Sequence, residues 1–301
     1  MSIIIIIALA YVIFKLVQSH STQTSEPAFA AAPATADPVI SNNPVPVNAV
    51  EANSRFAEKT SVRQVPSPRP GEEDPYEMIR ESVRLLDNVE EGGITAAESL
   101  MARAYELYPD NLDVCEKYAH ILSMRGYIDK QIGAYPQAFD VLSESIRILD
   151  DLFRQGHSSA MLQDLYMRTA LDCGETACLL NNWSEAVPLL SKVDPEKYPY
   201  AAALKAIVLI DAPGKHGTEL KQLVSILNHA VTTDNWQTDL QHATGYYVLS
   251  LIYSKGYPNE IRKNTKYAYE CIQECAKFDT ELATEQLKRY SKTLYGKIIY
   301  K

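Results

Sequence analysis

Cysteine and histidine side chains are the first groups to consider for chemistry in this sequence. Cys271 and Cys275 lie four residues apart, so both thiols would share one face of a helix. With His229 or His242 they could complete a zinc site. The competing interpretation is two thiols packed against a neighbouring helix. We favour the second, because structural zinc motifs usually present tighter loop pairs, and we therefore expect no metal and no other cofactor.

The number of cysteines bears on the cellular compartment. An odd number of thiols cannot all pair within one chain. Each cysteine falls in a helical pattern beside apolar residues, which favours small buried side chains in a reducing compartment. The five cysteines are Cys115, Cys173, Cys178, Cys271 and Cys275.

Motifs of the common catalytic sites are missing from the sequence. No glycine-rich phosphate loop precedes a helix, and neither His-Glu-x-x-His nor Gly-x-Ser-x-Gly occurs. The net charge of −9 also argues against nucleic acid as a partner, because phosphate contacts require clustered cations. We therefore expect a protein that is not an enzyme and that does not bind nucleic acid.

The elements that must position any site are predicted to be helices. Ala, Leu, Glu, Lys and Tyr are plentiful, glycine is scarce, and no stretch after residue 75 alternates as a strand. The clearest pair of helices lies within Ala170–Pro195, where Asn181-Asn182 breaks the pattern. Small residues recur on one face of its first helix, which lets a second helix come close; they are Ala170, Cys173, Gly174 and Ala177. The second helix presents Ala186, Leu190 and Val193.

Further pairs follow one another through residues 76–301. Glycine and proline mark their turns, as at Ala212–Gly214. In the second pair, Gly126–Pro136 is expected to be a long loop between the two helices. A last helix over Leu282–Leu294 is expected to close the series with a solvated outer face.

These pairs resemble the tetratricopeptide repeat and the related SEL-like repeat, over about residues 76–280. The resemblance rests on alanines, glycines and a proline at recurring offsets, among them Gly174, Ala186, Pro195, Ala243, Gly256 and Ala268. It implies an all-α, right-handed solenoid of five helix pairs plus a terminal helix. Pairs stack in such folds because one pair cannot bury its apolar face alone.

The resemblance also implies a binding surface. In these families the first helices of the pairs line a concave groove that receives partner proteins. Six polar residues of this chain fall there: Glu116, Lys117, His120, Arg168, Asp172 and Glu175. The set is mostly acidic, so a protein or peptide ligand of mixed or basic charge suits it better than a terminal carboxylate.

The N-terminal residues predict an attachment to the membrane. Residues 1–17 contain an apolar run that would span about 25 Å as a helix, slightly less than a bilayer core. A cleaved signal peptide is the alternative, but no basic residue precedes the run and the small-x-small site at Ala28–Ala30 lies far downstream. Lys15 flanks the C-terminal side, so the positive-inside rule places the body in the cytoplasm.

Residues 18–75 are rich in Pro and Ala and lack an apolar period, which predicts a disordered linker before the helical domain at 76–301. Together these features predict a single-pass membrane adaptor or scaffold that recruits a protein through its groove. Two alternatives stay open: an envelope-assembly factor whose repeats lie outside the cytoplasm, and a metal-dependent enzyme with a site assembled from scattered residues.

Overall fold

The computed structural model describes residues 73–87, 92–210, 216–257, 260–292 and 298–300. The predicted anchor and almost all of the predicted linker lie outside these residues, as does the predicted turn at Ala212–Gly214. Within the described part, none of the helices combines the length and the apolar character needed to cross a membrane.

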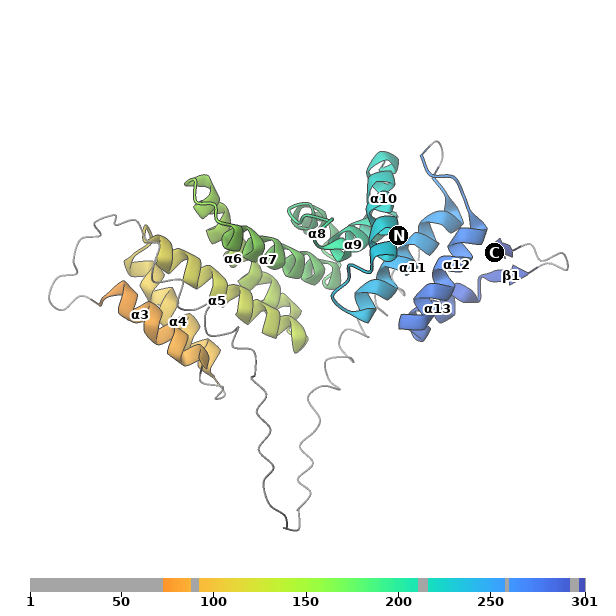
Figure 1. Ribbon diagram of the computed structural model, residues 1–301. Coiled ribbons are helices and arrows are strands. Elements are labelled where there is room, and N and C mark those ends of the chain that lie inside the picture. Colours follow the sequence, from red (N-terminus) through yellow and green to blue (C-terminus); the bar gives the residue numbers. More distant parts are fainter. Residues whose placement is uncertain (1–72, 88–91, 211–215, 258–259, 293–297, 301) are drawn as a thin grey trace, which may run out of the picture. The chain divides into compact units, whose positions relative to one another are not determined.

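The described residues are mostly helical, which confirms the predicted all-α class (Figure 1). Their helices are α3 (Pro75–Asp87), α4 (Gly93–Leu107), α5 (Leu112–Gln131), α6 (Tyr135–Arg154), α7 (Ala160–Leu179), α8 (Trp183–Leu190), α9 (Pro199–Ile210), α10 (Gly217–Thr233), α11 (Asp239–Lys255), α12 (Thr265–Phe278) and α13 (Thr280–Leu287). Two short strands, β1 (Tyr290–Lys292) and β2 (Ile298–Tyr300), follow them.

Polar side chains fix where several helices begin. The Asn111 side chain accepts hydrogen bonds from the backbone N–H groups of Asp113 and Val114, at 3.0 and 3.2 Å. Ser159 caps α7 and Thr238 caps α11 in the same way. Such caps satisfy N–H groups that have no partner inside the first turn, so these starts are encoded locally.

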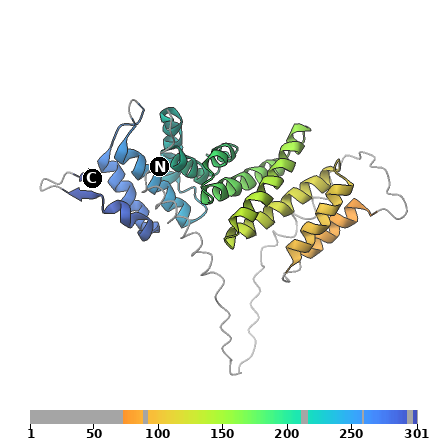
Figure 2. The same cartoon turned by 180° about the vertical axis from the view of Figure 1, so that it is seen from behind.

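Each helix packs against the next one in the chain, from α3 to α13, and Figure 2 shows the same neighbours from behind. The odd-numbered helices also contact one another in order: α3 contacts α5, α5 contacts α7, α7 contacts α9, α9 contacts α11, and α11 contacts α13. Side chains from the first helices of successive pairs can therefore meet at one site.

Glycines allow two of the closest helix approaches. A Cβ atom at Gly174 would lie 2.8 Å from Cγ of Leu190, and one at Gly126 would lie 2.5 Å from Cγ of Leu142. Unbonded carbon atoms prefer about 3.5–4.0 Å, so neither position has room for a side chain. The small-residue face predicted on α7 is confirmed, since its other members are fully buried: Ala170, Cys173 and Ala177.

The long loop predicted at Gly126–Pro136 is wrong. Helix α5 continues to Gln131, and only Ile132–Ala134 connects it to α6. Gly126 is buried inside the helix, where it faces Leu142. Gly126 allows two helices to pack closely and does not form a turn. The local sequence around a glycine does not distinguish these two roles.

The helix predicted over Leu282–Leu294 is also wrong in its second half, as is the prediction of no strand after residue 75. Helix α13 ends at Leu287, and Tyr290 pairs with Tyr300 in an antiparallel hairpin. The Tyr290 side chain is buried and its hydroxyl lies 3.1 Å from Oγ of Ser250 on α11. This tertiary contact outweighs the local preference for helix.

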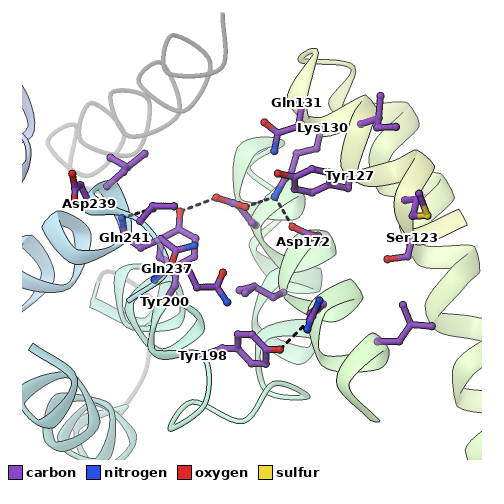
Figure 3. A pocket seen from close by; sticks show the side chains of 18 of the residues that line it. Ser123, Tyr127, Lys130, Gln131, Asp172, Tyr198, Tyr200, Gln237, Asp239 and Gln241 are labelled. Atoms are coloured by element: carbon purple, nitrogen blue, oxygen red, sulfur yellow. Dashed lines mark hydrogen bonds and ion pairs between the residues drawn. The ribbon is translucent and has the colours of Figure 1, made fainter. Parts of the chain in front are cut away.

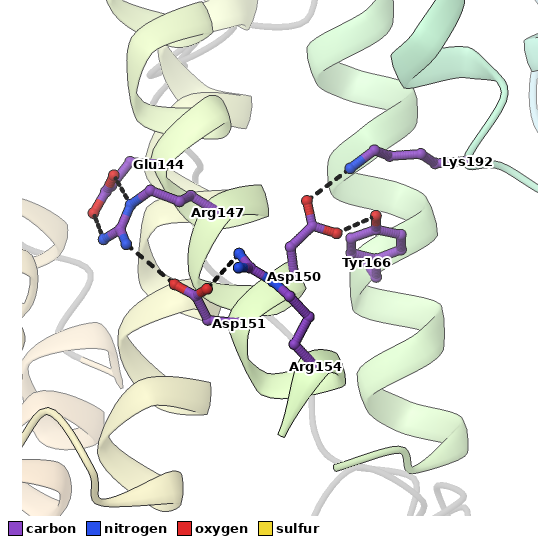
Figure 4. Close-up of polar contacts among 7 residues, drawn as sticks. All are labelled: Glu144, Arg147, Asp150, Asp151, Arg154, Tyr166 and Lys192. Carbon is purple, nitrogen blue, oxygen red and sulfur yellow. Dashed lines mark hydrogen bonds and ion pairs between the residues drawn. The ribbon is translucent and has the colours of Figure 1, made fainter. Parts of the chain in front are cut away.

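Ion pairs tie the middle helices together (Figure 4). One Asp150 oxygen accepts a hydrogen bond from the Tyr166 hydroxyl of α7 at 2.6 Å, and the other lies 2.7 Å from Nζ of Lys192, just after α8. On the adjacent turns of α6, Arg147 bridges Glu144 and Asp151. These contacts set the spacing of α6, α7 and the residues after α8.

Candidate binding pocket

A pocket of about 940 Å³ is formed by α5, α7, the first residues of α9, the first residues of α11 and the junction of α12 with α13 (Figure 3). Part of its wall is apolar and open to solvent. Tyr127, Ile128 and Phe278 are 46%, 40% and 38% exposed, respectively. Large apolar side chains are more often buried, so these three leave apolar surface open to solvent around one cavity.

A buried ion cluster forms one side of the pocket (Figure 3). Nζ of Lys130 lies 2.6 Å from Oδ1 of Asp172 and 2.6 Å from Oε2 of Glu175. The Tyr200 hydroxyl donates a hydrogen bond of 2.7 Å to the other oxygen of Glu175. The cluster joins α5, α7 and α9, which are helices from three successive pairs.

The electrostatics of this cluster follow from one cation shared by two carboxylates. Burial lowers the pKa of Lys130, but the charges of Glu175 and Asp172 outweigh this and raise it above the ordinary value. Burial keeps the pKa of Asp172 above its ordinary value even though Lys130 lowers it, and the negative charge of Glu175 adds to the rise. Burial and the adjacent Glu175 raise the pKa of Tyr200 well above the ordinary value, so its hydroxyl stays a donor.

The structure brings four of the six predicted groove residues to this pocket: His120, Arg168, Asp172 and Glu175. Glu116 and Lys117 lie on α5 one turn before His120, but they do not line the pocket. Both are half-buried; burial and Asp113 raise the pKa of Glu116, and burial lowers that of Lys117.

Three of the predicted residues are already engaged by partners within the chain, and the first is Asp172, which pairs with Lys130. Glu175 is buried, and both of its oxygens are occupied by Lys130 and Tyr200. Arg168 is exposed, but its guanidinium lies 2.5 Å from Asp164 and 3.3 Å from the Tyr198 hydroxyl. His120 is an exposed residue of α5, and its pKa is lowered because surrounding protein atoms partly desolvate the ring and because Lys117 and Arg168 lie nearby.

Sequence reasoning missed the residues that make most of the apolar wall. Tyr127 and Ile128 fell in a stretch expected to be a loop, and Lys130 was not recognised as the partner of carboxylates more than forty residues away. One signal was present: Met124, Ile128 and Ile132 recur at four-residue spacing, which is typical of one face of a helix rather than of a loop. Phe278 and Gln237–Gln241 also line the pocket, and nothing in the sequence near them indicates this.

The zinc hypothesis finds no geometric support in the described residues. No group of three or more His, Cys, Asp or Glu side chains lies close enough there to hold a metal ion. Cys271 and Cys275 are free and buried. His242 stacks on Trp236 and Tyr246, and its Nδ1 lies 3.1 Å from Asp234.

All five thiols are free and buried, as predicted. Burial raises the pKa of Cys115 and of Cys173 to about 11, and that of Cys271 to about 12. Because the thiolate is the reactive form, these cysteines are inert in the folded protein.

The structure thus defines a helical protein in which α5, α7, the starts of α9 and α11, and the junction of α12 with α13 enclose a partly apolar pocket. Comparison of the chain with protein-family models finds no match, and comparison with curated proteins finds none either.

Proposed function

We propose that this chain is a membrane-anchored adaptor: a solenoid of tetratricopeptide or SEL-like repeats that binds a segment of a partner protein in the pocket between α5, α7 and α11. The observation that carries the proposal is the exposure of Tyr127, Ile128 and Phe278 around a single cavity. A helix or strand of a partner would bury these side chains, which is the main source of favourable free energy in such grooves.

Two features of the packing support the repeat architecture. The odd-numbered helices contact one another in order, as the first helices of stacked pairs do. In addition, Gly126 is followed twelve residues later by Ala138, and Gly174 by Ala186, with both alanines fully buried in the second helix of their pair. A repeated offset between glycine and alanine indicates that the two pairs use the same close contact.

The membrane part of the proposal rests on residues 1–17, whose apolar run suits one anchor, and on Lys15, which favours a cytoplasmic body. The five free buried thiols are compatible with a reducing compartment. Residues 18–75 would then act as a tether that raises the local concentration of the pocket near membrane partners.

The side of the membrane can be tested with an introduced thiol, because the native cysteines are buried. Gln163 is an exposed residue of α7, so a Gln163→Cys variant presents an accessible thiol. We expect an impermeant maleimide to label this variant only after the cells are permeabilised, while the parent chain stays unlabelled. Labelling of the variant in intact cells would place the body outside the cytoplasm and support the envelope-assembly alternative.

Partner binding can be tested by photo-crosslinking in membranes. A photoreactive amino acid at Tyr127, inside the pocket, is expected to capture a specific protein that is identified by mass spectrometry. The matched control is the same amino acid at Met161, which is 48% exposed on α7 but does not line the pocket. Equal capture at both positions, or none at Tyr127, would contradict the proposed binding surface.

A further inference from the structure

The pocket is lined by more carboxylates than cations, and only some of these carboxylates form ion pairs with other described residues. Four carboxylates line it, from Asp172, Glu175, Asp239 and Asp279, against two cations, Lys130 and Arg168, so the lining carries a net charge of −2 with histidine neutral. Both cations are already paired within the chain, Lys130 with two carboxylates and Arg168 with Asp164. Lys130 is buried in its cluster, and Arg168, although exposed, would have to exchange its contact with Asp164 to meet an acidic ligand.

Asp239 and Asp279 differ from the other two carboxylates. Asp239 lies in the first turn of α11, and Asp279 caps α13 by accepting a hydrogen bond of 2.9 Å from the backbone N–H of Leu282. In the part of the chain that the structure describes, neither forms an ion pair with a lysine or an arginine. Both carboxylates lie at the N-terminus of a helix, where the helix dipole favours a negative charge.

These two anions lie beside apolar side chains of the same pocket. Phe278 directly precedes Asp279, and Leu240 directly follows Asp239; both apolar residues line the cavity. Across from Asp239, α5 contributes Tyr127 (Figure 3), and Ile128 of the same helix also lines the cavity. A ligand that fits this surface must bury apolar groups and present cations at the α11 side.

We propose that the occupant of the pocket is a basic amphipathic segment of the partner protein, with Lys or Arg side chains against Asp239 and Asp279 and apolar side chains against Ile128 and Phe278. The inference rests on the proposed adaptor function and names the chemistry of its ligand. Charge complementarity favours a basic segment over an acidic one. Among the described residues of the pocket, an acidic segment would meet the carboxylates of Asp239 and Asp279, which form no ion pair with a lysine or an arginine, and would meet no cation that lacks an ion pair.

The ligand chemistry is tested with three fluorescent peptides of equal length that share the same Leu and Phe positions. Their remaining positions carry Lys and Arg in the first peptide, Gln in the second and Glu in the third. Fluorescence anisotropy is measured on the full-length protein in a mild detergent. We expect the basic peptide to bind at least about tenfold more tightly than the Gln peptide, with an affinity that falls as salt is raised.

Variants then locate the effect. A double variant, Asp239→Asn with Asp279→Asn, should reduce the preference for the basic peptide to about threefold or less, while asparagine still caps α13. The matched control, Asp140→Asn with Glu185→Gln, removes two exposed carboxylates outside the pocket and should leave the preference unchanged.

Equal binding of the three peptides, tighter binding of the Glu peptide, or a preference that survives the Asp239 and Asp279 changes would overturn this inference. So would the absence of any peptide binding. In each of these cases, capture of a partner at Tyr127 would still support the adaptor, so the two proposals fail separately.

Discussion

Replacing Lys130 with methionine is expected to lower the free energy of unfolding by about 3–5 kcal/mol, the largest effect of any single change considered for this protein. Lys130 is the cation that lies 2.6 Å from both Asp172 and Glu175, and its side chain is only 10% exposed. Methionine fills a similar volume but leaves two partly or fully buried carboxylates without a counter-charge. The midpoint of urea unfolding of the full-length protein in a mild detergent measures the loss.

The pH dependence of the variant has a definite sign. Burial already raises the pKa of Asp172, and Lys130 is the charge that opposes this rise. Without Lys130 the folded-state pKa of Asp172 lies further above its unfolded value, so the folded variant binds more protons than the unfolded chain. Its stability therefore rises as the pH falls from 7 towards 5, and the deficit relative to the parent protein shrinks. In the parent, Lys130 has a raised folded-state pKa, so its contribution is complete at neutral pH and is lost only at strongly alkaline pH.

Two further variants complete this experiment. The triple change Lys130→Met, Asp172→Asn and Glu175→Gln removes all the charges of the cluster and should recover a large part of the loss. Lys277→Met, which removes a side chain that is 65% exposed and paired with Glu274, should cost less than about 1 kcal/mol. A Lys130 variant as stable as the Lys277 variant would show that the cluster does not hold the three helix pairs together.

Valine at Gly126 is expected to destabilise the protein by about 1–3 kcal/mol, the cost of overpacking a close helix contact. The Cβ atom would lie 2.5 Å from Cγ of Leu142 and 3.3 Å from the backbone oxygen of Ala138. The side chain of Leu142 can move in part, but the backbone of α6 must move as well. Replacing glycine within a helix otherwise gains a few tenths of a kcal/mol, which is too little to offset the clash.

The control for this prediction is Gln222→Val, which places valine on an exposed face of α10. Both variants are compared by thermal unfolding, and we expect a lower midpoint for Gly126→Val alone. An unchanged midpoint would mean that α5 and α6 are further apart than the structure has them. It would also restore the earlier interpretation of Gly126 as part of a loop.

Local signals in the sequence account for the helical class and for where several helices begin. Apolar and small residues at three-to-four spacing mark a buried face, as Ala170 and Ala177 show, and polar residues such as Asn111 and Ser159 cap the first turn. These signals act within a few residues of one another. They could therefore be recognised without knowing the rest of the fold.

The tertiary structure alone decided the pocket and the corrected elements. Lys130 finds its carboxylates 42 and 45 residues away, and Tyr290 finds Ser250 at a separation of 40. Gly126 has the local pattern of a turn and becomes a packing position only because Leu142 lies against it. Which side chains are buried together depends on how the helices stack. The free energy gained by that burial exceeds the conformational preference of the local sequence, so α5 runs on through the predicted loop and α13 ends before the predicted residue.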